Sequence, residues 1–462
     1  HHHGNVEIEY LNSEPDPETP TEMVETIKDY ANYAYRRHRG KGAPDDSVRA
    51  RISRNLGGLP LEWFSDEDSP ERKQQDSINE RKLTLYVEDF ADFTPNCRLV
   101  ILDACFNGSF HKDKYIAGSY IFDEGETAAT IGNSVNVLQD KWSDRYLGLA
   151  GLGMRLGNLV KYNTYLESHF MGDPTFHFTG AVDGIDVNEM LQQPASWWKS
   201  QLDSRYPALR TMAMRQLTDA DMMTSDQLLD IYKNDDSEIV RMEAMMLLSL
   251  FDDANFVACL DMAVDDSYEM IQRYGLNFIA KRGDKELIPA IVRLATRNNT
   301  GKRIEFGISQ AAALYPADLL VAEVDRSFDP RDYAEGDAVR GYVSDALRKY
   351  ADSYRLQDVD NICHNDTLPV KTKLRDIRTL RNSTMHYKVD DLLEYVQKCD
   401  DEQVCIDLLE ALGWFRPSFR HADISAVALA MSRDSSRPEA VRNMALKTYN
   451  RIEDNRKNNA KQ

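Results

Sequence analysis

The chain has 462 residues, of which 42% are hydrophobic and 29% are charged, and its formal net charge is −20. That length suits two or three domains with large cores. The acidic balance excludes a general nucleic-acid binder, which would carry a basic stripe, and disfavours adhesion to anionic lipid. No apolar run approaches the roughly 20 residues that cross a bilayer, so we expect no membrane span.

The first part of the chain mixes strand-like runs, glycines and helical patterns. Residues 21–37 have an amphipathic pattern that predicts a helix, with Thr19 or Thr21 available as its N-cap. Residues 39–46 are rich in glycine and proline, which predicts a loop.

Further along, strand-like and helical runs alternate. The charged stretch 66–81 predicts a solvated helix or loop, and the β-forming runs 99–102 and 127–135 predict two buried strands. Residues 147–159 read as an apolar helix with several glycines, and 169–178 as a short segment broken at Gly-Asp-Pro. Strands that alternate with helices predict an α/β sandwich with a largely parallel sheet.

The most informative motif is Asp-Ala-Cys-Phe-Asn-Gly at 103–108, which follows the first of these strands. A buried parallel strand that ends on Cys105 and then turns at Asn107 and Gly108 presents a thiol at the carboxyl edge of its sheet. The alternative is that Cys105 is a small buried hydrophobic residue, since free cysteine is often found in cores.

A nucleophilic cysteine needs a base, and histidine is the usual one. The chain opens with three histidines followed by Gly4. Adjacency to the glycine selects His3 as the partner of Cys105, with His2 as the reserve. The backbone N–H groups of Gly4 and Cys105 are the expected oxyanion-hole donors. Alternatively, the histidines are the remnant of a purification tag.

Four segments in this order resemble the gingipain-type cysteine peptidases, a family with a caspase-like fold. They are His3-Gly4, the nucleophile segment 103–108, AATIGNSVNVLQDKW at 128–142, and FMGDP at 170–174. The resemblance implies a cysteine endopeptidase that acts through a thioester, with Cys105 as nucleophile and His3 as proton donor to the leaving amine. It also implies a secreted, cell-surface or periplasmic bacterial protein and a protein or peptide substrate.

The resemblance further implies that Trp142 lines the pocket for the residue before the cleaved bond, which we expect to be basic. Asp140 and Asp144 flank this tryptophan and could bind a basic side chain, although plain surface charge is the alternative. The six cysteines show no zinc-type spacing, so we expect neither a metal nor a cofactor.

Two departures from the family pattern stand out. Family members have several strands before the His-Gly pair, so we expect a companion chain or segment to precede this sequence and complete the fold. The stretch between histidine and cysteine is also long, and residues from about 10 to 80 look like a helical insertion. The predicted peptidase-like domain is 1–195.

The remainder, 196–462, is predicted to be an all-α solenoid. The triplet Asp-Asp-Ser occurs at 235–237 and 265–267, and Val-Arg-x-x-Ala occurs at 240–244 and 441–445. These repeats resemble HEAT repeats, in which paired helices stack. We expect aspartate to cap each helix, valine and alanine to face the core, and arginine to reach a neighbour. A concave solenoid surface would suit a protein partner.

Two other functions stay open. The first is a catalytically inactive, peptidase-like scaffold that binds partners through its repeats. The second is a transpeptidase that uses the same cysteine and histidine. Cys399 and Cys405 read either as a disulfide or as two thiols in a helical core.

Overall fold

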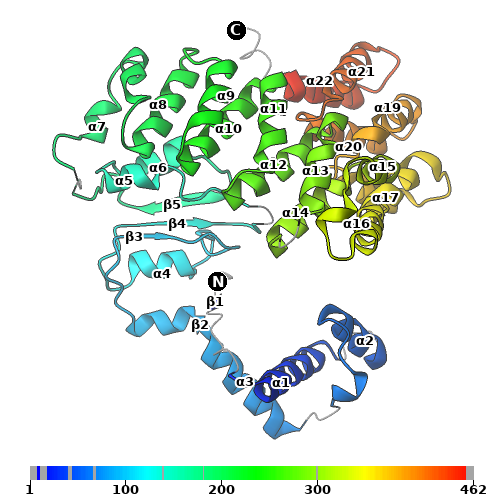
Figure 1. Cartoon of the computed structure of the whole chain (residues 1–462), viewed down its shortest axis with the longest axis horizontal. Coiled ribbons are helices and arrows are strands. Elements are labelled where there is room, and N and C mark those ends of the chain that lie inside the picture. Colours follow the sequence, from blue (N-terminus) through cyan, green and yellow to red (C-terminus); the bar gives the residue numbers. More distant parts are fainter. Residues whose placement is uncertain are drawn as a thin grey trace. The chain divides into compact units, whose positions relative to one another are not determined.

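The structure is a computed structural model that describes residues 8–10, 18–39, 44–65, 69–137, 140–179, 182–297 and 300–453. The chain divides into two compact units, His1–Leu191 and Gln192–Gln462 (Figure 1). The predicted domain boundary, after residue 195, lies just inside the second unit.

Helices dominate the first part of the first unit: α1 (Pro20–His38), α2 (Asp45–Asn55) and α3 (Pro70–Leu83). The predicted helix over 21–37 is confirmed. The Thr19 hydroxyl accepts the Glu22 N–H and the Glu22 carboxylate accepts the Thr19 N–H, a capping box that starts α1. A separate small core holds this region together; its buried members are Ala31, Tyr35, Val48, Ile52 and Phe64.

The predicted caspase-like α/β sandwich is wrong. Helices make up 64% of the chain, and a three-stranded sheet accounts for only 3%. This sheet has the order β3 (Leu99–Ile101), β4 (Ala129–Asn133), β5 (Ser168–Gly172). β4 pairs with β3 in parallel but with β5 antiparallel, so the sheet is not largely parallel either. A two-stranded antiparallel sheet pairs β1 (Ile8–Tyr10) with β2 (Thr84–Tyr86).

The sheet stays small because its apolar runs are short and turns interrupt the chain around them. The predicted helix over 147–159 forms instead as two short helices, α5 (Leu147–Gly151) and α6 (Gly157–Tyr162). Gly153 lies between them with φ of 91°, a left-handed conformation that glycine adopts without strain and that no α-helix continues through. A further short helix, α7 (Val187–Met190), closes the unit.

A hydrophobic cluster covers one side of this sheet. Helix α4 (Ile116–Phe122) packs against β4, and the buried members of the cluster are Val87, Phe90, Leu102, Tyr115, Ile116 and Ala117. The buried side chain of Leu102 thus anchors the chain to the core directly after β3. The residues that follow Leu102 are held at the edge of the sheet.

The second unit is helical throughout its described residues. Its helices are α8 (Pro207–Asp219), α9 (Ser225–Asn234), α10 (Glu238–Phe251), α11 (Ala254–Ala263), α12 (Glu269–Arg282), α13 (Ile288–Ala295), α14 (Lys302–Ala312), α15 (Ala317–Ser327), α16 (Gly336–Ala351), α17 (Tyr354–His364), α18 (Val370–Thr379), α19 (Val389–Lys398), α20 (Glu402–Leu412), α21 (His421–Arg433) and α22 (Glu439–Glu453).

The packing of these helices is compatible with a solenoid. Helix α10 contacts α8, α9, α11 and α12, and the next-but-one pairing continues from α9 with α11 through to α14 with α16. This is the contact pattern expected of stacked helix pairs. The predicted core positions Val240, Ala244, Val441 and Ala445 are all buried.

One contact reaches across many helices. The buried His386 ring lies 2.8 Å, through Nε2, from the carbonyl oxygen of Ala280 near the end of α12, and 2.8 Å, through Nδ1, from the Ser418 hydroxyl. Because a carbonyl only accepts, Nε2 carries the proton and the serine hydroxyl donates to Nδ1. The Phe419 N–H adds a bond to the carbonyl of Arg282. The second unit therefore departs from a purely linear array of neighbouring repeats.

Candidate active site at Cys105

Cys105 lies where the chain leaves the sheet. β3 ends at Ile101, and the Leu102 N–H continues the parallel pairing with a 2.8 Å bond to the Ile131 carbonyl. Three residues later the thiol is half-buried, and Phe106 turns the chain sharply with φ of 59°. A left-handed conformation at a bulky residue is strained, and such strain concentrates at functional sites. The predicted strand before Cys105 is present, but it ends at Ile101, four residues before the cysteine on which it was expected to end.

The sulfur of Cys105 faces the backbone of the segment after β4. The Val137 N–H donates to Sγ at 3.2 Å, and the Val137 carbonyl lies 3.8 Å from the same sulfur. A directed N–H donor suits a sulfur that carries negative charge during a reaction. The thiol is therefore held in one orientation, and its exposed part faces solvent.

The Asn-Gly that follows the cysteine has a structural role. The buried Asn107 side chain accepts the Asn133 N–H at 2.9 Å, and Gly108 donates its own N–H to the Asn133 carbonyl at 2.9 Å. A Cβ at Gly108 would lie 2.4 Å from the carbonyl carbon of Gly132, so only glycine allows this close approach. The loop after Cys105 is thus clamped directly onto the end of β4.

Asn133 is the polar centre of this edge. Its side-chain amide donates to the carbonyls of Leu102 and Ala104, at 3.2 and 3.0 Å, and so supports the backbone just before the cysteine. Its carbonyl oxygen lies 2.6 Å from the Lys141 ammonium and 2.8 Å from the Ser168 hydroxyl. Loss of this amide would leave several buried polar groups without partners.

Lys141 is itself buried beside this asparagine. Burial lowers the pKa of Lys141, and the Glu167 carboxylate, 3.8 Å away, partly offsets that effect. The ammonium also lies 4.7 Å from the centre of the Tyr165 ring. Sequence reasoning did not single out either Asn133 or Lys141, and an asparagine at the end of a β-run carries no distinctive pattern.

The surroundings of Trp142 differ from those of the predicted substrate pocket. Trp142 is only 4% exposed, and its backbone is held by Tyr165 and Asn163. The Arg145 guanidinium lies 5.5 Å from the centre of its ring. A cation of the protein therefore already occupies the neighbourhood in which the resemblance places a basic substrate side chain.

Acidic groups do gather near this tryptophan. Asp140 is half-buried and Asp144 is exposed. Loss of surrounding water raises the pKa of Asp103, with the charges of Asp140 and Asp144 adding to the shift, although Asp103 as a residue still reaches the surface. The hydrogen bond with Ser143 and the charge of Lys141 act in the opposite direction. The charges of Asp140 and Asp144 therefore act on the carboxylate of Asp103.

The predicted base and its glycine, His3 and Gly4, lie outside the described residues, so their pairing with Cys105 stays a prediction. Among the described histidines, His169 on β5 belongs to the sheet. Its Nε2 lies 2.6 Å from the Ser134 hydroxyl, and its ring packs edge-on to Phe110. Burial, followed by the charge of Lys141, lowers the pKa of His169. It is a structural histidine with a hydrogen-bond partner.

No protein-family model matches this chain, and no curated protein matches its sequence. The resemblance to gingipain-type peptidases therefore rests on the four short segments alone. None of the helices in the described ranges combines the length and hydrophobicity needed to traverse a bilayer. Within those same ranges, histidine, cysteine and acidic side chains form no cluster of three or more suited to a metal ion.

Proposed function

We propose that this chain is a cysteine peptidase whose nucleophile is Cys105. The observation that carries the proposal is the sulfur of Cys105 at the sheet edge, 3.2 Å from the Val137 N–H and followed by a strained residue. This cysteine lies between a strand and a sharp turn, and hydrogen bonds from Asn133 hold the backbone just before it. Covalent catalysis requires a nucleophile that is fixed in this way.

In this proposal the Cys105 thiolate attacks the carbonyl carbon of a peptide bond and forms a tetrahedral intermediate. Collapse of the intermediate breaks the C–N bond, the leaving amine takes a proton from His3, and an acyl-thioester remains on Cys105. Water, deprotonated by the histidine, then releases the acid and regenerates the thiol. The backbone N–H of Cys105 and that of Gly4 would hold the oxyanion.

A second candidate is an inactive scaffold. The observation that favours it is the position of Arg145 against the ring of the buried Trp142, which leaves no evident place there for a basic substrate residue. In that case the helical second unit would carry the function by binding a protein partner on its surface.

The test is cleavage of fluorogenic peptides that carry arginine or lysine before the reporter amide. The full chain should cleave them, Cys105→Ala should abolish cleavage, and Cys97→Ala should leave the rate unchanged. Cys97 is a matched control because it is an exposed free cysteine a few residues upstream. Cleavage at an equal rate by the Cys105→Ala variant would rule out Cys105 as the nucleophile. No cleavage of any peptide by the full chain with an unblocked thiol would favour the scaffold.

The same assay separates a hydrolase from a transpeptidase. With an added amine nucleophile, mass spectrometry of the products should show only the free acid if water resolves the thioester. An amide of the added amine as the main product would point to acyl transfer instead.

A further inference from the structure

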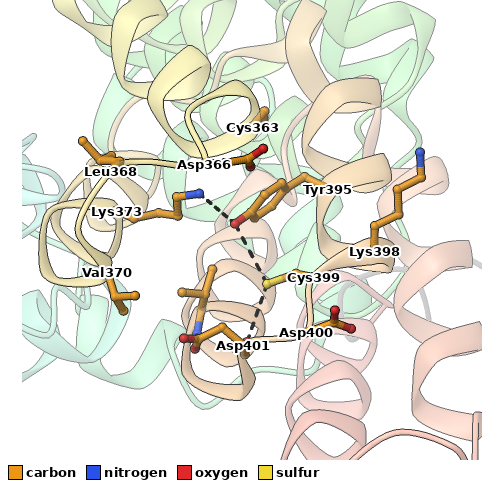
Figure 2. A pocket seen from close by; sticks show the side chains of 11 residues that line it. Cys363, Asp366, Leu368, Val370, Lys373, Tyr395, Lys398, Cys399, Asp400 and Asp401 are labelled. Carbon is orange, nitrogen blue, oxygen red and sulfur yellow. Dashed lines mark hydrogen bonds between the residues drawn. The ribbon is translucent and has the colours of Figure 1, made fainter.

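A pocket of about 420 Å³ opens in the second unit, far in sequence from Cys105. It lies between the end of α17, the start of α18, the end of α19 and the start of α20, and Figure 2 shows the side chains that line it. Apolar residues, two lysines, three aspartates and two thiols contribute to its wall. One of these thiols, Cys399, lies at the end of α19 within a chain of polar contacts.

Several groups surround the sulfur of Cys399. The Tyr395 hydroxyl is 4.0 Å away, the Asp401 carbonyl is 3.6 Å away, and the thiol of Cys405 forms a hydrogen bond with it. The hydrogen bond from Cys405 is the main cause that lowers the pKa of Cys399 to about 6, with help from the Asp401 backbone and Tyr395 and against the effect of burial. A lowered pKa favours the thiolate, which is the reactive form of a cysteine.

Cys405 lies behind Cys399, away from solvent. It is 2% exposed, and its Sγ lies 3.2 Å from the Cys399 carbonyl and 3.7 Å from the Val396 carbonyl. Its hydrogen bond to Cys399 and its burial both raise its pKa, so Cys405 keeps its proton while Cys399 is a thiolate. A half-buried cysteine at a pocket wall, with a buried thiol next to it, is the arrangement of an attacking and a resolving cysteine.

We propose that Cys399 and Cys405 form a dithiol–disulfide couple that exchanges with low-molecular-weight disulfides entering this pocket. The Cys399 thiolate attacks one sulfur of a small disulfide, whose S–S bond breaks and releases one thiolate that takes up a proton. Cys405 then loses its proton to water, attacks the Cys399 sulfur of the mixed disulfide, and expels the second small thiol. Two protein thiols are oxidised and one small disulfide is reduced to two thiols.

The second step becomes possible because the first removes the cause that holds the proton on Cys405. Once Cys399 is in a mixed disulfide, it no longer carries a negative charge for the Cys405 thiol to donate to. The sulfur of Cys405 already lies 3.2 Å from the carbonyl oxygen of Cys399, so the two residues are direct neighbours across the turn between α19 and α20, where a disulfide bond of about 2 Å can form.

The rest of the pocket carries charges of both signs and suits a disulfide that carries both amino and carboxylate groups. Lys373 lies 3.0 Å from the Tyr395 hydroxyl and 4.9 Å from the centre of its ring, so it holds the tyrosine in place. Burial raises the pKa of Tyr395, so its hydroxyl keeps a proton to donate to Cys399. Asp366, Asp400 and Asp401 also line the pocket, and we expect them to favour ligands that carry an amino group as well as a carboxylate. Oxidised glutathione has both groups and is the probe for the test.

The experiment treats the full chain with oxidised glutathione and maps every cysteine by tryptic mass spectrometry. Cys399 and Cys405 lie on one tryptic peptide, which ends at Arg420 because Pro417 blocks cleavage after Arg416. The expected result is loss of two hydrogens from this peptide. Cys405→Ala should instead accumulate glutathione on Cys399, and Cys399→Ala should leave Cys405 unmodified.

Cys363 is the matched control, since it lines the same pocket but burial raises its pKa to about 12. In the untreated protein near neutral pH, iodoacetamide should label Cys399 on the order of a hundredfold faster than Cys363. Equal labelling of the two, or an unchanged peptide mass after glutathione treatment of protein with an unaltered circular-dichroism spectrum, would overturn the proposal. Cys105→Ala should show the same disulfide chemistry, which keeps this test independent of peptidase activity.

Discussion

The guanidinium of Arg241 on α10 donates two hydrogen bonds, each 2.8 Å long, to the carboxylate of Asp266 in the loop before α12. Arg210 on α8 makes the same pair of 2.8 Å bonds to Asp235, in the loop before α10. Both arginines and both aspartates are 31 residues apart (241 − 210 and 266 − 235). Each aspartate therefore connects the loop it occupies to the preceding helix pair.

Arg241→Ala should lower the free energy of unfolding by about 2–4 kcal/mol, because it leaves the nearly buried Asp266 carboxylate without its main partner. The side chains of this pair are only 14% and 6% exposed. Chemical denaturation at neutral pH measures the change. Arg215→Ala is the control, since its ion pair with Asp219 is exposed and should contribute less than about 1 kcal/mol. Equal losses of stability in the two variants would contradict the stabilising role of the Arg241–Asp266 ion pair.

This ion pair also predicts a response to acid. Burial would raise the pKa of Asp266, but its hydrogen bonds with Arg241 and the Tyr268 N–H outweigh burial and lower it. Because the folded-state pKa is lowered, the stabilisation is present above the ordinary aspartate pKa and is lost as the pH falls through the folded value. The wild-type protein should therefore lose more stability than Arg241→Ala over that acidic range.

The lowered pKa of His386 predicts a second loss of stability at mildly acidic pH. Burial lowers its pKa from 6.5 to about 4, so the unfolded chain binds a proton between these values and the folded chain does not. Stability should fall as the pH drops from 6.5 towards 4, by up to about 3 kcal/mol. His386→Gln should be less stable at neutral pH but should show a flatter pH dependence.

Gly283→Ala should be strongly destabilising. Gly283 ends α12 with φ of 74°, and a Cβ there would lie 2.2 Å from the ring of His386. The left-handed backbone and the clash together should cost about 3 kcal/mol or more. Gly341 lies within α16 with open space around it, so Gly341→Ala should stabilise the protein by up to about 1 kcal/mol. Calorimetry of the two variants should show transitions shifted in opposite directions.

Gly108→Ala tests the close contact between the loop after Cys105 and the end of β4. The added Cβ would meet the Gly132 backbone at 2.4 Å, so we expect a loss of about 2–4 kcal/mol in the first unit and reduced peptide cleavage with the thiol still present. Gly151→Ala is the control, because nothing lies within 4 Å of its Cβ position. Unimpaired cleavage in Gly108→Ala would show that the position of this loop does not matter for activity.

Local patterns predicted local structure well. The capping residue Thr19, the strand before Cys105 and the buried faces of Val240 and Ala244 all follow from spacing and residue type, and the structure confirms each. The predicted role of the repeat aspartates was wrong: Asp235 does not cap α10 but accepts the Ser237 N–H and the Arg210 guanidinium.

Long-range arrangement could not be predicted in the same way. The number of strands and the direction of β5 depend on which segments meet, and residues 168–172 carry no pattern that selects an antiparallel partner. Similarly, an Asp-Asp-Ser repeat suggests a spacing of 30 residues, whereas the contacts of Asp235 and Asp266 show 31. The choice between a disulfide and two thiols at Cys399 and Cys405 also depends on three-dimensional contact, and the structure has both as free thiols.

The bonds that His386 and Phe419 make to the end of α12 have a consequence for synthesis on the ribosome. His386 follows Ala280 by 106 residues (386 − 280), and Phe419 follows Arg282 by 137 residues (419 − 282). The two carbonyls are therefore synthesised on the order of ten seconds before the groups that bond to them. During that interval the newly made helices have an unfinished end with exposed apolar surface. A nascent chain stalled before residue 386 should therefore bind chaperones more strongly than one stalled after residue 419.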